Sequence, residues 1–373
     1  MGFDDLASDL CISIYEFLSL DALAQLIVTN KEMEQLLRYF LRDVITAVTV
    51  NRPTPQTVKL VSHCRKLISL RFVSDDCTNA TKIQRYKSCS EPLLAVIDAN
   101  SATLELISLD HFFCHWQTRW NELQLFQELA KCNRLRYFDC RMAKEPLHLG
   151  FLPKTLLGLR IDSTSMQNLR TLRQFDHLRG VSLSLYGSPD HQLVATRLAA
   201  LSSLEYLHLY VGVHPDDRNN STVWNLPHLR HLRFFLDVFM ENDDDPQLLC
   251  VVPRINAPLL QIVSLDGTIP TALEELSASF VDCPSLSVIL LHDQVFYRSA
   301  TTHQFVLQSR RWSRGRLACT RSPSFELPLA APMTEEEHLL QMITRCHQSA
   351  CLCCPLPVAE VSPLRPLKRF RYA

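Results

Sequence analysis

The chain has 373 residues, of which 47% are hydrophobic and 21% are charged, and its formal net charge is -1. This near-neutral balance gives no whole-chain argument for binding nucleic acid or an acidic membrane surface, so we expect neither as a partner. Only 8 residues are glycine, and no glycine-rich phosphate-binding motif occurs. No run of 18 or more apolar residues occurs, so we expect no membrane span.

Residues 4–40 carry an apolar pattern that is typical of short helices. The first helical stripe has apolar residues at spacings of three and four, namely Leu6, Leu10, Ile14, Phe17 and Leu18. A second stripe opens at Leu23 after Asp21, and a third begins at Met33. Such short helices bury little surface alone, so their apolar side chains pack either on the rest of this chain or on a partner.

The run from Leu6 to Leu23 resembles an F-box. The positions that match this family without a gap are Leu6, Asp9, Leu10, Ile14, Phe17, Leu18 and Leu23. The sequence departs from the family at Ala7, Ala22 and Met33, which stand where the family has proline, aspartate and an aromatic residue. The resemblance implies docking on a Skp-type adaptor and, through it, on a cullin. The residues expected to bind the adaptor are Leu6, Ala7, Leu10, Ile14, Leu18 and Leu23.

An apolar repeat, L-x-x-L-x-L with aliphatic substitutes, follows this unit. It occurs nine times between residues 67 and 291, at spacings of 21 to 37 residues. L-x-L alternation predicts a strand with one buried face, and stacked copies predict a parallel sheet on the concave side of a solenoid. Residues 189–201 and 271–281 have helical patterns and are expected to cover the convex side.

Turn-like segments such as Cys64-Arg65-Lys66 and Cys283-Pro284-Ser285 precede many copies of this motif. The pattern resembles the leucine-rich repeats of F-box adaptors. The family's asparagine after the last leucine of the motif is missing here, so we expect irregular repeats without a buried asparagine ladder. The predicted fold is α/β: an N-terminal three-helix F-box followed by an irregular leucine-rich-repeat solenoid with a parallel concave sheet. The alternative is a generic α/β domain with scattered leucines.

The sequence divides into four predicted units. Residues 1–45 form the F-box-like domain, and residues 46–295 form the solenoid of about nine repeats. Residues 296–322 are arginine-rich and form a possible terminal cap. The run of arginines is interpreted either as a basic surface strand or as a signal for nucleic-acid binding or import. Residues 323–373 combine a proline-rich linker, a short helix and a cysteine-rich tail.

A protein-binding surface is predicted on the concave side. There, the residues next to each buried L-x-L position point outward. They are rich in aromatic side chains and arginine, which dominate binding hot spots. The predicted substrate-binding residues are Tyr137, Arg160, Tyr206, His208, Tyr210, His231, Arg233 and Phe235. The alternative is that some of the tyrosines only pad neighbouring strands.

The 14 cysteines do not predict disulfides or a metal site. The first residues are acidic and lack the features of a secretory signal, so we expect reduced thiols and a cytoplasmic or nuclear location. His111, Cys114 and His115 lie close in sequence, but the aromatic residues around them favour an insertion that packs on the solenoid over a metal. The cysteine-rich tail could supply zinc thiolates, yet it lacks two spaced pairs.

No catalytic motif occurs, so we predict a non-enzymatic chain without cofactor or metal. Three hypotheses remain at this point. The first is a substrate-recognition adaptor that docks a target protein, of unknown identity, onto a Skp-cullin-F-box ubiquitin ligase. The second is a leucine-rich-repeat scaffold with no ligase role, in which the N-terminal helices only cap the solenoid. The third is an enzyme on the same fold.

Overall fold

The computed structural model describes most of the central part of the chain. The described residues are 38–51, 54–73, 89–110, 119–140, 148–161, 166–185, 191–213, 222–238, 252–267, 273–291, 294–299 and 304–307. Of the helices expected over residues 4–40, all but residues 38–40 lie outside these ranges, and so do the insertion around His111 and His115 and the tail from residue 308.

One sheet of twelve strands runs through the described chain, and its strands follow the sequence in order. All neighbouring pairs from β1 to β12 are parallel, and β13 and β14 add two antiparallel pairs at the end. The strands are β1 (Ala47–Asn51), β2 (Ser69–Val73), β3 (Leu106–Asp110), β4 (Tyr137–Cys140), β5 (Gly158–Ile161), β6 (Gly180–Leu185), β7 (Tyr206–Val213), β9 (His231–Val238), β11 (Ile262–Gly267), β12 (Val288–Leu291), β13 (Gln294–Arg298) and β14 (Phe305–Leu307).

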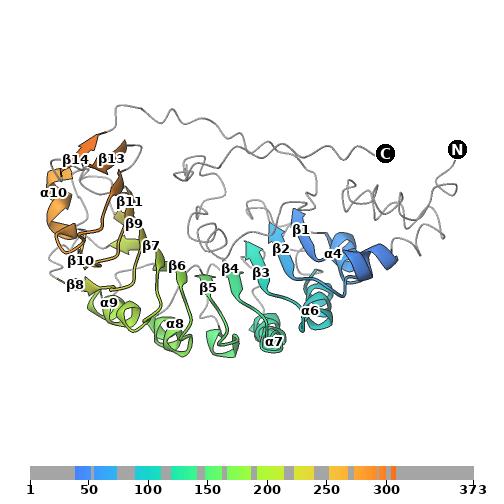
Figure 1. Cartoon of the computed structure of the whole chain (residues 1–373). Helices are drawn as coiled ribbons and strands as arrows, with labels where there is room; N and C mark the ends of the chain where they lie inside the picture. Colours follow the sequence, from blue (N-terminus) through green and yellow to red (C-terminus); the bar gives the residue numbers. More distant parts are fainter. Residues whose placement is uncertain are drawn as a thin grey trace, which may run out of the picture.

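The sheet bends into an arc, with strands on the inner side and helices on the outer side (Figure 1). The outer α-helices are α4 (Pro55–Val61), α6 (Ser90–Ala99), α7 (Arg119–Leu129), α8 (Met166–Thr171), α9 (His191–Ala199) and α10 (Leu273–Ser277). Shorter helical turns are η2 (Phe40–Val44), η3 (Leu149–Phe151), η4 (Leu172–Gln174) and η6 (Ala278–Phe280). The helices predicted over 189–201 and 271–281 are therefore confirmed, as α9 and as α10 with η6.

The nine copies of the apolar motif all fall on parallel strands, from β2 to β12. Pairing sets the motif residues in rows, so that Leu207 and Leu209 of β7 lie beside Leu232 and Phe234 of β9. These rows and the apolar faces of the helices form one continuous buried core along the arc. Each unit covers the apolar surface of the next, which gives the whole a solenoid-like construction.

Hydrogen-bonded turns lead into the strands, as the sequence predicts. The N–H of Leu135 donates to the carbonyl of Cys132 at 3.0 Å, and the N–H of Leu260 donates to that of Ala257 at 3.0 Å. The residue before each strand then continues the ladder: the N–H of Arg136 donates to the carbonyl of Glu105 at 2.8 Å. The turns are therefore in register along one edge of the sheet.

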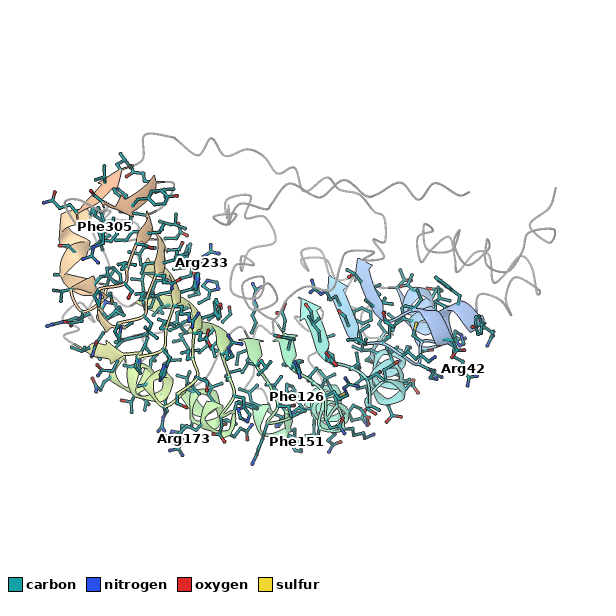
Figure 2. The ribbon with its side chains drawn as sticks, in the orientation of Figure 1. Arg42, Phe126, Phe151, Arg173, Arg233 and Phe305 are labelled. Carbon is teal, nitrogen blue, oxygen red and sulfur yellow. The ribbon has the colours of Figure 1, made fainter. Side chains whose placement is uncertain are left out.

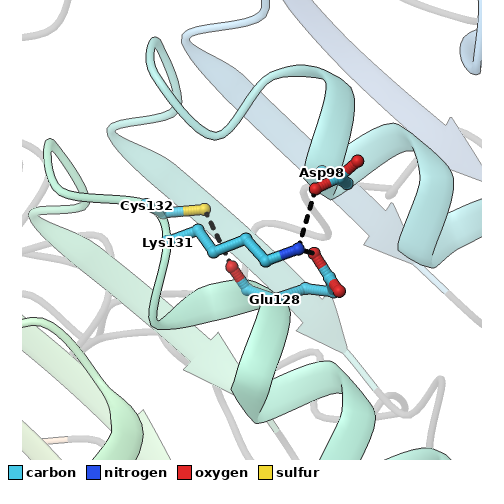
Figure 3. Close-up of polar contacts among 4 residues, drawn as sticks. All are labelled: Asp98, Glu128, Lys131 and Cys132. Carbon is cyan, nitrogen blue, oxygen red and sulfur yellow. Dashed lines mark hydrogen bonds and ion pairs between the residues drawn. The ribbon is translucent and has the colours of Figure 1, made fainter.

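Neighbouring outer helices are joined by an ion-pair cluster on the surface. The Lys131 ammonium, just after α7, lies 2.9 Å from a carboxylate oxygen of Asp98 in α6 and also pairs with Glu128 (Figure 3). The side chains of Lys131 and Asp98 are at least half exposed, so the cluster contributes little to stability. The apolar faces of α6 and α7, which include Leu93, Val96 and Phe126, are buried and hold the helices to the sheet.

Three features were not predicted from the sequence. Strand β1 precedes the first copy of the motif and pairs with β2. Two short strands, β8 (Val223–Asn225) and β10 (Arg254–Asn256), pair with each other away from the large sheet, and the buried ring of Trp224 packs edge-on against Phe234. The sheet also crosses the predicted solenoid boundary at residue 295, which lies inside β13, and continues through β14. Strands β13 and β14 lie at the start of the arginine-rich segment, and its residues from 308 on lie outside the described ranges.

Candidate protein-binding surface

The outward-facing side chains of the inner side are held in rows by the strand register. The middle row runs from β2 to β11 through Arg71, Ser108, Asp139, Arg160, Ser182, His208, Arg233 and Ser264. A row beside it contains Tyr137, Tyr206 and His231, and a row on its other side contains Tyr210 and Phe235. The structure therefore places all eight predicted substrate-binding residues on the inner side of one sheet.

Polar contacts join neighbouring strands in two parts of the middle row, β3 to β5 and β6 to β7. The Ser108 hydroxyl donates to Oδ2 of Asp139 at 3.0 Å, and Nε of Arg160 lies 3.9 Å from Oδ1 of the same carboxylate. Farther along, the Ser182 hydroxyl and Nδ1 of His208 form a hydrogen bond of 3.1 Å. All five residues are buried, and burial strengthens such polar contacts. This part of the row is therefore a structural element of the sheet.

Four predicted binding residues are not accessible, which corrects the expectation that they form a solvated surface. Tyr137, Arg160, Tyr206 and His208 are all buried, and the Arg160 side chain has no exposed surface. Tyr137 and Tyr206 belong to a small apolar cluster with Leu106. The alternative that tyrosines pad neighbouring strands therefore holds for these two. Strand alternation gives the face that a side chain occupies, but long-range packing determines whether that face meets solvent.

The other four predicted residues, Tyr210, His231, Arg233 and Phe235, are partly buried, with the Arg233 side chain only 11% exposed, and we call them the aromatic patch. The rings of Tyr210 and Phe235 stack with centroids 4.9 Å apart and planes 14° apart. His231 stacks in the same way on buried Tyr206, at 5.0 Å and 16°. Arg233 projects to the inner side of the arc, whereas Arg173 and Phe151 project from the outer side (Figure 2).

Asp266 of β11 belongs beside the aromatic patch but was not predicted. Its carboxylate lies 3.6 Å from a guanidinium nitrogen of Arg233, and it pairs in register with Phe235. The signal was present in the sequence, because Asp266 directly follows the motif residue Leu265, as Phe235 follows Phe234. The carboxylate places an opposite charge beside the guanidinium within the patch.

The patch offers stacked rings, an imidazole and a guanidinium, which is a composition suited to binding a protein surface. Two buried cysteines, Cys64 and Cys132, are poor nucleophiles. Burial raises the pKa of the Cys64 and Cys132 thiols to about 12, which keeps them protonated at neutral pH.

Among the described residues, no group of three or more His, Cys, Asp or Glu side chains is placed to hold a metal ion. No helix in the described ranges is long and apolar enough to cross a membrane.

No known protein-family model matches this chain, and a comparison with curated proteins also finds no match. The predicted adaptor-binding residues, from Leu6 to Leu23, lie outside the described residues.

Proposed function

We propose that this chain is a substrate-recognition adaptor of a Skp-cullin-F-box ubiquitin ligase, and that it has no catalytic activity of its own. In this proposal residues 1–45 are an F-box that docks on a Skp-type adaptor and, through it, on cullin. The arc from β1 to β14 is a leucine-rich-repeat solenoid that binds a target protein. The reduced state expected for its thiols fits a site of action in the cytoplasm or nucleus.

The observation that carries the proposal is the order of two features in one chain. An F-box-like motif, from Leu6 to Leu23, stands directly before an arc whose strands carry nine copies of the apolar motif. An adaptor needs these two parts: a short apolar unit for the ligase and a large surface for the target. The aromatic patch on the inner side of the arc supplies a surface of suitable composition.

The second candidate is a leucine-rich-repeat scaffold without a role in ubiquitination. In that case the apolar side chains of the N-terminal unit would pack on the solenoid and would have no external partner. The two functions differ in one measurable property, which is direct binding of a purified Skp-type adaptor to the N-terminal unit.

The test uses the full chain immobilised for biolayer interferometry, with purified Skp-type adaptor in solution. Changing Leu10 and Ile14 together to Asp should abolish binding, because it puts two charges into an apolar interface at a cost of several kcal/mol. The matched control is the double change of Ser8 and Ser19 to Asp. It adds the same charge at positions that the helical pattern places off the apolar stripe.

Adaptor binding by the wild type and the serine double variant, with loss only in the Leu10/Ile14 variant, would support the proposal. If the wild-type chain fails to bind any Skp-type adaptor, the scaffold function is favoured instead. A thermal melt of both variants checks that the arc itself remains folded.

A further inference from the structure

An open depression lies at the edge of the sheet where strands β6, β7, β9 and β11 begin. Its volume is about 400 Å³, near the lower end of the range for ligand-binding pockets. Its walls come from the turns that precede successive strands, so it lies outside the aromatic patch. The proposed adaptor function assigns it no role.

Backbone hydrogen bonds set the positions of three charged residues in this depression. Arg179, Glu205 and Arg230 each stand directly before a strand. The N–H of Glu205 donates to the carbonyl of Arg179 at 2.8 Å, and the N–H of Arg230 donates to the carbonyl of Glu205 at 2.8 Å. Their backbones are therefore held at the spacing of adjacent strands, about 4.8 Å.

The central carboxylate orients the two guanidinium groups. Nε and Nη2 of Arg179 donate to the two carboxylate oxygens of Glu205 at 2.8 and 3.0 Å. Nε of Arg230 lies 3.5 Å from Oε2 of Glu205. The Glu205 side chain is only 18% exposed, whereas that of Arg230 is 49% exposed. Two guanidinium groups thus share one carboxylate. The guanidinium of Arg230, which carries five N–H donors, reaches solvent beside it.

The other walls add imidazole and apolar groups. His177 and His228 are exposed and line the depression together with Leu157 and Leu259. Its lining includes no Phe, Tyr or Trp, so it lacks the stacking surface that single-stranded nucleic acid uses. The chemistry is therefore a positive centre between short apolar walls, on a chain whose net charge is -1.

We propose that this depression binds an anionic side chain, phosphate or carboxylate, on a segment of a partner protein. The Arg230 guanidinium makes the main contact, since its planar fork fits both groups with paired hydrogen bonds. Arg179 and Glu205 hold it in position, and the leucines contact the residues next to the anion. This surface is separate from the aromatic patch and does not depend on a role in ubiquitination.

The test uses the full chain and three fluorescein-labelled degenerate nonapeptide mixtures, read by fluorescence anisotropy. The mixtures are identical except for the central residue, which is phosphoserine, glutamate or serine. The phosphoserine or the glutamate mixture should bind at least about tenfold more tightly than the serine mixture, and their order identifies the preferred anion. Arg230→Gln should weaken the binding of the preferred mixture by about tenfold.

The matched control is Arg136→Gln, which changes an exposed arginine at the equivalent position before β4. Its effect should stay below about twofold, because four strand spacings separate it from Arg230. The proposal is overturned if all mixtures bind equally or not at all, or if Arg136→Gln matches Arg230→Gln. Binding of an oligonucleotide alone, weakened by Arg230→Gln, would also overturn it and assign the surface to nucleic acid.

Discussion

The side-chain oxygen of Asn100 accepts a hydrogen bond from the backbone N–H of Leu67 at 2.9 Å, across 33 residues of sequence. Its amide nitrogen donates to the carbonyls of Cys64 at 3.0 Å and Val96 at 2.8 Å. The side chain is buried and joins the end of α6 to the turn before β2. The sequence predicts no ladder of asparagines after the last leucine of the motif. Asn100 stands before the motif of β3 instead, and its side chain gives buried backbone N–H and C=O groups their hydrogen-bond partners.

Asn100→Ala should therefore destabilise the protein by roughly 3 kcal/mol, because it leaves buried N–H and C=O groups unsatisfied. Chemical denaturation followed by circular dichroism measures the change. The control is Asn133→Ala in an exposed turn, which should shift stability by less than about 0.5 kcal/mol. Faster hydrogen exchange at the Leu67 amide in the Asn100 variant would locate the effect. Equal stability of the two variants would contradict this account.

Gly267, at the end of β11, has a positive φ of 95°. A Cβ at this position would also collide with the backbone carbonyl of Leu236 on β9. Gly267→Ala should therefore cost at least about 1–2 kcal/mol, from the strained backbone alone, and lower the thermal midpoint. Gly150→Ala is a matched control, because a Cβ there meets no atom within 4 Å. The prediction fails if the two variants melt at the same temperature.

The thiols of Cys64 and Cys132 should resist alkylation in the folded protein. Burial raises the pKa of each to about 12, and for Cys132 the Glu128 and Asp98 carboxylates add to the rise. Iodoacetamide at pH 8 should label both slowly in buffer and rapidly in urea, where the pKa returns to about 8.5. Mass spectrometry of the labelled peptides measures both rates. Rapid labelling in buffer, or a native disulfide at either residue, would contradict the prediction.

The same shift has a consequence for stability. A thiol whose pKa is raised in the folded state adds to the free energy of unfolding. This contribution is present in full below the unfolded pKa, about 8.5, and is lost as pH rises toward 12. The thermal midpoint should therefore fall between pH 8 and pH 10. Cys64→Ala should reduce that fall, because one of the groups that cause it has been removed.

The sequence predicts much of the sheet because its signal is local. Leu207 and Leu209 alternate with Tyr206 and His208, and this period of two is visible within one strand. Strands of three residues, such as Val223–Asn225, are too short to carry such a pattern. Accessibility is harder to predict, because it depends on distant parts of the chain. Arg160 and Arg233 occupy equivalent strand positions, yet the Arg160 side chain is fully buried and the Arg233 side chain is 11% exposed.

The aromatic patch should carry target binding in the proposed adaptor, and Phe235 is the residue that tests it most directly. Its ring stacks on Tyr210 and is half-buried. In Phe235→Ala, the loss of stacking should lower the free energy of unfolding by only about 0.5–1.5 kcal/mol, in addition to the effect of the lost buried area. A hot-spot loss of ~2 kcal/mol in partner affinity corresponds to roughly 30-fold weaker binding. Quantitative mass spectrometry of proteins captured by each variant measures this loss, with the recovered Skp-type adaptor as the internal reference. Phe151→Ala is the matched control, because this ring projects from the outer side of the arc and is 42% exposed (Figure 2). Partners that depend on the patch should disappear with Phe235→Ala and remain with Phe151→Ala, whereas identical partner sets would move target recognition away from the inner side of the arc.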